Sequence, residues 1–259
     1  MPKYVVISRE HYGAKKLRPH VNFAYLAREA LVPIVSAELQ AVALSMPIGF
    51  VEQSGRYTLV ALMSFIPGRN LFVGPDNQWL GKYIPAMIRG NPFRVLRQEG
   101  SDDFVLGIDE DSPLIVDANE TGEAFYDDEG KPTASVKAML TFLTGVERSR
   151  TATDLALAAL AKARVICPWD IRIKMGDGEK PVTGLHRIDE VALNGLSDDQ
   201  FSQLRKAAAL PIAYAQLISI GQTTALERLV ILQENLQKAQ KPTLPEQIVF
   251  DGDTLNKVR

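Results

Sequence analysis

The sequence has little cysteine and no excess of charge of one sign. Cys167 is the only cysteine among 259 residues, so the chain cannot form an internal disulfide, and this composition favours a reducing compartment. The 29 basic and 31 acidic side chains give a formal net charge of -2, and they are interspersed along the chain. The absence of a basic field argues against nucleic acid as a partner.

The sequence also lacks a hydrophobic run long enough to cross a membrane, which requires about 18 or more apolar residues. The richest run, "LALAALAKARVI", is interrupted by Lys162 and Arg164. Residues 1–13 contain only a short apolar stretch at 4–7, which predicts a first strand rather than a signal peptide. We therefore expect a cytoplasmic protein with no integral membrane segment.

Several catalytic and metal-binding motifs are absent as well. The chain has no Gly-x-Ser-x-Gly elbow and no Walker loop, which argues against the hydrolases and nucleotide-binding proteins that depend on them. Its three histidines, His11, His20 and His186, have no partner at metal-ligand spacing. Cys167 has apolar neighbours that favour an inert thiol. We expect no cofactor and no metal, and non-enzymatic action is the favoured interpretation.

The first half of the chain has the pattern of an antiparallel sheet. "RYTLVALMSF" and "RNLFV" read as two strands joined by a turn at Pro67-Gly68, and "DFVLGID" reads as a further strand. Residues 37–44 predict a short helix before a Pro47 stop. "YIPAMIRG" predicts another, with Pro85 in its first turn and Gly90 beyond its end.

The second half has mainly helical periodicity. From residue 133, apolar residues recur at spacings of three and four, which predicts two amphipathic helices, the second capped by Thr151 or Thr153. Ser197 predicts the cap of a further helix, and a long helix follows with a kink near Gly221. Gly176-Asp177-Gly178 predicts one hairpin, and "QIVF" could add an edge strand.

The predicted fold is therefore α+β, with an antiparallel sheet-rich N-terminal half and a mostly helical C-terminal half that contains one hairpin. We expect a single domain over residues 1–259, with a division into 1–130 and 131–259 as the alternative. The broad apolar face of the last helix fits either the core or a contact between two copies of the chain.

The segment "GRNLFVGPDNQWLGKYIPAMIRGNPF", residues 68–93, concentrates the residue types that are common at binding surfaces. The candidate ligand or partner-binding residues of the chain are His20, Asn22, Asn70, Trp79, Tyr83, Arg89 and Phe93. The same aromatics, beside glycine and proline, also suit a packed corner between a hairpin and a helix. The residue types alone favour the packed corner.

This segment resembles the SapC family of bacterial proteins, and the likeness extends over about residues 20–229. The positions that match the family pattern are Asn70, Leu71, Phe72, Trp79, Tyr83, Pro85, Ala86, Arg89, Pro92 and Phe93. Gly90-Asn91 departs from that pattern. The resemblance implies an association with bacterial surface layers or transport operons, and it brings no catalytic residues with it. Members also occur beside halogenase-like and cupin-like proteins, which implies a cytoplasmic accessory role.

Three hypotheses follow. The first is a non-enzymatic binding or accessory protein with a protein or peptide partner, acting through the surface around residues 79–93. The second is a structural component of the cell surface layer, as the family name implies. The third is an enzyme, or an accessory partner of a halogenase-like or oxygenase-like enzyme, that uses His20, Asn22, Tyr83 and Arg89.

Overall fold

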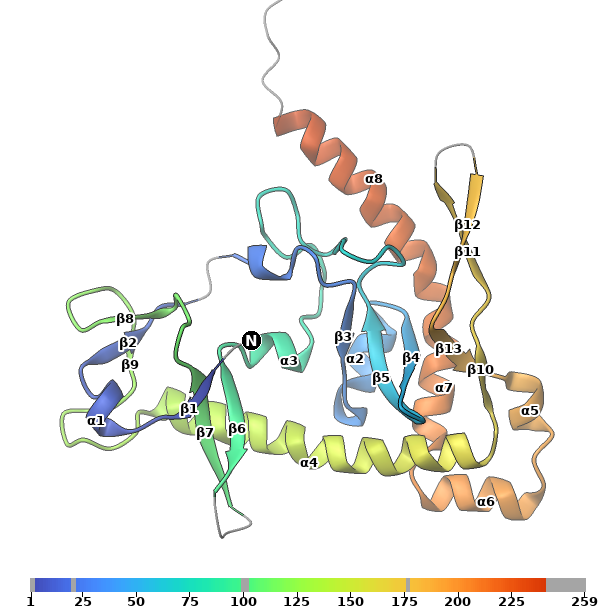
Figure 1. Cartoon of the computed structure of the whole chain (residues 1–259), viewed down its shortest axis with the longest axis horizontal. Coiled ribbons are helices and arrows are strands. Elements are labelled where there is room, and N and C mark those ends of the chain that lie inside the picture. Colours follow the sequence, from blue (N-terminus) through green and yellow to red (C-terminus); the bar gives the residue numbers. More distant parts are fainter. Residues whose placement is uncertain (1–2, 20–21, 99–102, 176–177, 241–259) are drawn as a thin grey trace, which may run out of the picture.

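The computed structural model describes residues 3–19, 22–98, 103–175 and 178–240 (Figure 1). Within these ranges the strands form four antiparallel sheets. The largest has the order β10-β13-β4-β5-β3. Its strands are β3 (Leu31–Pro33), β4 (Ile48–Gln53), β5 (Arg56–Leu62), β10 (Ile166–Pro168) and β13 (Leu185–Ile188). This sheet therefore combines strands from both halves of the chain.

The other sheets are smaller. One has the order β1-β7-β6, from β1 (Tyr4–Val6), β6 (Phe93–Arg97) and β7 (Phe104–Asp109). A second pairs β2 (Lys15–Leu17) with β8 (Ile115–Asp117) and β9 (Glu123–Ala124). The last is the hairpin of β11 (Ile171–Met175) and β12 (Gly178–Val182). It confirms the predicted hairpin, whose turn residues 176–177 lie outside the described ranges.

Short helices connect the strands, and longer ones follow. The short ones are α1 (Arg9–Tyr12), η1 (Ala24–Leu26), η2 (Ser36–Glu38), α2 (Leu39–Ala43), α3 (Ala86–Arg89), α5 (Glu190–Asn194) and η3 (Ile220–Gln222). The longer ones are α4 (Ala134–Lys162), α6 (Asp198–Lys206), α7 (Leu210–Ser219) and α8 (Thr223–Gln240). No helix in the described part of the chain combines the length and hydrophobicity needed to span a membrane.

The β4–β5 hairpin shows why the central sheet forms. Its two-residue loop, Ser54-Gly55, has positive φ angles of 52° and 76°, the backbone that tight antiparallel hairpins favour. The register pairs Phe50 with Leu59, and both side chains are almost fully buried. The sheet packs against α2, α7 and the C-terminal part of α4 in the main hydrophobic core.

One continuous helix, α4, replaces the two helices expected after residue 133. It has 29 residues, or about 43 Å at 1.5 Å per residue, and it passes across the β6–β7 hairpin and continues below the central sheet (Figure 1). Leu143 packs in the core of the smaller sheet, and Leu157 packs in the main core. One uninterrupted helix therefore contributes buried side chains to both hydrophobic cores.

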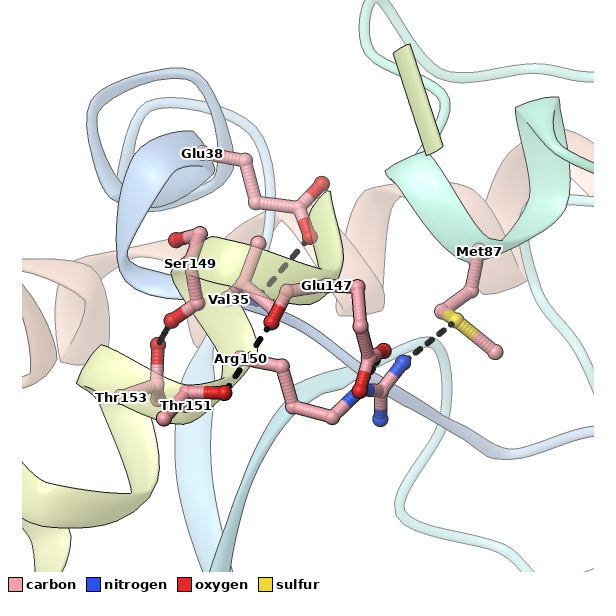
Figure 2. Close-up of polar contacts among 8 residues, drawn as sticks. All are labelled: Val35, Glu38, Met87, Glu147, Ser149, Arg150, Thr151 and Thr153. Atoms are coloured by element: carbon pink, nitrogen blue, oxygen red, sulfur yellow. Dashed lines mark hydrogen bonds and ion pairs between the residues drawn. The ribbon is translucent and has the colours of Figure 1, made fainter. Parts of the chain in front are cut away.

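The prediction that Thr151 or Thr153 caps a second helix is wrong, because both residues lie inside α4. Thr153 is also buried. Its hydroxyl donates to the Ser149 carbonyl at 2.7 Å and accepts from the Ser36 amide at 2.8 Å. The Ser149 hydroxyl accepts from the Ala37 amide at 3.0 Å. Both side chains thus satisfy amides at the start of η2 (Ser149 and Thr153 are drawn in Figure 2).

The stretch "RNLFV" is likewise not a strand. Only an isolated bridge between Val73 and Trp79 forms there, and the Leu71 amide donates to the Met63 carbonyl at 3.1 Å. In the turn between Val73 and Trp79, the Asp76 carboxylate accepts from the Gln78 amide at 3.1 Å. The short strands β8 and β9 are further elements that the sequence patterns above do not predict.

The remaining helix predictions agree with the structure. Ser197 caps α6, together with the Gln200 side chain. The break at η3 separates α7 from α8 beside Gly221, which confirms the kink. "QIVF" lies outside the described residues. The α+β fold class is confirmed, with antiparallel sheets, most strands in the N-terminal half, and long helices in the C-terminal half.

Candidate functional site

Residues 68–93 connect the central sheet to the β1-β7-β6 sheet, and the second part of this connection is organised around the buried carboxylate of Glu38. Glu38 is 6% exposed and ends η2. It accepts hydrogen bonds from the Val35 amide at 3.1 Å, the Tyr83 hydroxyl at 2.8 Å and the Ala86 amide at 2.8 Å. The bond to Val35 is drawn in Figure 2. One carboxylate therefore joins the start of η2 to the start of α3.

Three of the candidate residues meet in this region. The Arg89 guanidinium donates to the Tyr83 hydroxyl at 3.1 Å and to the Ile84 carbonyl at 3.0 Å. The Trp79 indole donates to the Tyr83 carbonyl at 3.0 Å. Burial, followed by the hydrogen bond to Glu38, raises the pKa of Tyr83 to about 12. The polar groups of these three side chains thus bond to one another or to nearby backbone.

Contacts with rings complete this corner. The Trp79 ring stacks on Phe72 with centroids 5.3 Å apart. The Arg89 guanidinium lies 4.7 Å from the ring centroid of Phe142 on α4, a geometry that favours cation–π attraction. The observed contacts are those of a packed corner, as the residue types favoured.

The other candidates lie apart from this corner. Asn70 is 3% exposed, and its side chain donates to the Leu26 carbonyl and accepts from the Phe72 amide. Phe93 is buried in the core of the β1-β7-β6 sheet. Asn22 is exposed, and its side-chain oxygen accepts from the Ala24 amide at 3.2 Å. His20 lies outside the described residues.

Beside this corner, between β6 and α4, is a cavity of about 300 Å³ that we call the arginine pocket. Its charged lining residues are Arg94, Arg97, Glu147 and Arg150. The lining therefore contains three arginines and one glutamate. Apolar side chains from both sheet and helix complete the lining: Tyr4, Met87, Phe93, Val95, Phe104, Leu143 and Val146.

The arginines are held in different ways. The Arg150 Nε donates to the Glu147 carboxylate at 2.8 Å, and its guanidinium approaches the Met87 sulfur at 3.4 Å (Figure 2). The Arg94 guanidinium lies 4.6 Å from the Tyr4 ring centroid and forms no ion pair with any described residue. Arg94 can therefore pair with an anionic group from another molecule.

Sequence reasoning missed this pocket and the role of Glu38. The Glu147–Arg150 pair was readable as an i,i+3 pair on a helix. Arg94 stands between Phe93 and Val95, the alternation of a half-buried strand. Nothing in local sequence indicates that β6 lies beside the middle of α4, because that contact depends on the tertiary fold.

These features define an α+β protein whose motif-rich segment connects two antiparallel sheets beside a pocket lined by three arginines and one glutamate. The family model for SapC matches residues 7–226, which is most of the chain. The chain therefore belongs to the SapC family. No curated protein and no solved structure is significantly similar to it.

Proposed function

We propose that this chain is a non-enzymatic binding or accessory protein that holds an acidic segment of a protein partner in the arginine pocket. The observation that carries the proposal is the Arg94 guanidinium, which lines the pocket without an ion pair to the described residues. Arginine presents a planar fork of donors that suits carboxylates.

The shape and composition of the arginine pocket support a peptide rather than a bare anion. Apolar side chains, among them Tyr4 and Phe104, lie beside the guanidinium groups. An acidic residue next to an apolar one would therefore satisfy both parts of the lining. Aromatic residues and arginine are also the types that contribute most to protein interfaces.

The hydrogen bonding of the packed corner supports binding over catalysis by the candidate residues. Tyr83 donates to Glu38, and Arg89 donates to Tyr83. A catalytic proton donor or acceptor has to reach a substrate, whereas these groups are bonded within the protein. The proposed contact surface accordingly shifts from Trp79 and Arg89 to Arg94.

The test is selection of short peptides from a random library on the full-length protein. We expect the selected peptides to carry Asp or Glu beside an apolar residue. Arg94→Ala should weaken their binding about tenfold, which is the effect of losing one charge-assisted contact. Arg205→Ala, which removes an exposed arginine on α6, is the matched control and should bind as the wild type does.

Two results would contradict the proposal. One is selection of peptides without acidic residues. The other is unchanged peptide affinity in Arg94→Ala with the fold intact by circular dichroism. Because Arg94 is exposed, its replacement tests binding with less risk to the fold than replacement of Trp79, which packs between Phe23 and Phe72.

A further inference from the structure

A second cavity shares Asn91 with the arginine pocket but has the opposite electrostatic character. It encloses about 460 Å³, which is within the range of small-molecule sites. Segments distant in the sequence form it: the chain after β2, the region of η1, the end of β7 and the loop that follows β7. We call it the Asp109 cavity.

The charged lining residues of this cavity are Arg18 and Asp109. The Arg18 guanidinium is already paired with the Glu120 carboxylate at 2.5 Å. Asp109, by contrast, forms no ion pair with the described residues. Its Oδ1 atom is buried and has no hydrogen-bond partner among them. The charge left without a partner in the Asp109 cavity is therefore negative.

A buried carboxylate oxygen without a donor is unfavourable, because desolvation is not offset by a hydrogen bond. Asp109 lines the cavity, so a donor from another molecule that reaches this carboxylate would offset that cost. A positively charged donor would also neutralise the carboxylate, and hydrogen bonds between charged groups are the stronger kind.

The rest of the lining restricts the occupant. Ala24, Pro113 and Leu114 give an apolar wall, to which Tyr25 adds an aromatic ring. Burial raises the pKa of Tyr25 to about 12, and its hydroxyl is hydrogen-bonded to the Asn91 side chain. Tyr25 is therefore neutral at physiological pH, and it adds no second negative charge to the cavity.

We propose that the Asp109 cavity binds a primary ammonium group carried on a short apolar body. The ammonium group would donate to the carboxylate, and the apolar body would lie against Tyr25 and Leu114. A divalent metal ion fits less well, because a single carboxylate lines the cavity and the described residues contain no cluster of three or more His, Cys, Asp or Glu side chains that could hold a metal. This proposal does not depend on the function proposed for the arginine pocket.

The first experiment compares three probes of similar shape on the full-length protein by isothermal titration calorimetry. Phenethylamine carries the ammonium group, 2-phenylethanol is a neutral analogue, and 3-phenylpropionate is an anionic one. We expect phenethylamine to bind at least about tenfold more tightly than either analogue, because only it can pair with the carboxylate. This comparison needs no variant and is unaffected by folding defects.

The second experiment tests whether the charge that binds the ammonium group belongs to Asp109. Asp109→Asn keeps the shape of the side chain and should weaken phenethylamine binding about tenfold or more. Asp111→Asn removes the same charge two positions away, at an exposed residue that does not line the cavity. The affinity of the Asp111→Asn variant for phenethylamine should equal that of the wild type.

A third probe, Nα-acetyl-lysine methylamide, distinguishes a free amine from a lysine side chain of another protein. Asp109-dependent binding of either amine supports the proposal, and the tighter one identifies the source of the ammonium group. Three results would overturn it: neither amine binds, the neutral analogue binds as tightly as phenethylamine, or Asp109→Asn folds and leaves amine affinity unchanged.

Discussion

Replacement of Glu38 by alanine tests whether the packed corner depends on this carboxylate. The change leaves three donors without their acceptor: the Val35 and Ala86 amides and the Tyr83 hydroxyl. Tyr83 is half-buried and can turn to water, but Ala86 is 2% exposed and Val35 is 4% exposed. A buried donor left unsatisfied costs about 1–3 kcal/mol, so two such amides predict a loss of about 2–6 kcal/mol.

Urea unfolding followed by circular dichroism measures this loss directly, provided that the m-value is unchanged. A central value of about 4 kcal/mol corresponds to a fall in melting temperature of about 8–16 °C for a chain of this size. Glu29→Ala is the matched control, because Glu29 is exposed, and it should stay within about 0.5 kcal/mol of the wild type.

The Tyr83→Phe variant separates the contribution of one donor. Alone it should cost about 1 kcal/mol. In the Glu38→Ala background it should cost much less, because the bond it removes is already absent, so the coupling energy should be about 1 kcal/mol. If Glu38→Ala lowered the stability by less than about 1 kcal/mol, the carboxylate would not hold the corner together and this reasoning would be refuted.

Two further predictions concern α8 and the tyrosines. The Gln233 side chain donates from α8 to the carbonyls of Asn70, Leu71 and Val73 at 2.8–3.2 Å, so Gln233→Ala should cost about 2 kcal/mol in urea unfolding. It should also speed hydrogen exchange in residues 70–73, whereas Glu234→Ala, at an exposed position, should do neither. Tyr83 has a pKa raised to about 12, while an unfolded tyrosine titrates near 10. Its contribution to stability is therefore complete below about pH 10 and is lost between about pH 10 and 12. Tyr25 also has a pKa raised to about 12, so phenolate absorbance should show late-ionising groups whose number Tyr83→Phe lowers by one. An unchanged number in that variant would contradict the assignment.

The sequence correctly predicted those elements whose ends are set by residues a few positions away. Ser197 caps α6, and Pro85 and Gly90 bound α3, because caps and helix-breaking residues act within a few positions. Local sequence failed where tertiary contacts decide. Thr153 has the residue type of a cap, but it bonds to Ser36, more than a hundred residues away along the chain.

The candidate site divides in the same way. Three candidates that are close in sequence, Trp79, Tyr83 and Arg89, also lie together in the structure. Their polar groups, however, are hydrogen-bonded within the protein. Glu38 and Arg94, by contrast, have partners on other elements. Glu38 accepts from Ala86 at the start of α3, and Arg94 lies beside Tyr4 of β1 in a pocket that residues of α4 also line. No periodicity within one segment could indicate those contacts.

Residues 68–93 link the family motif to both proposed sites, and Phe93 of the motif itself lines the arginine pocket. Residues 68–93 leave the central sheet and enter the β1-β7-β6 sheet at Phe93, and the arginine pocket and the Asp109 cavity meet at Asn91, just before that entry. Trp79 lines neither cavity but packs against Phe72, so its replacement should lower stability and can affect binding only indirectly. A change at Arg94 or Asp109 would remove a charge from one cavity and leave the other intact. Binding measured beside stability therefore separates residues that position the two sites from those that contact an occupant.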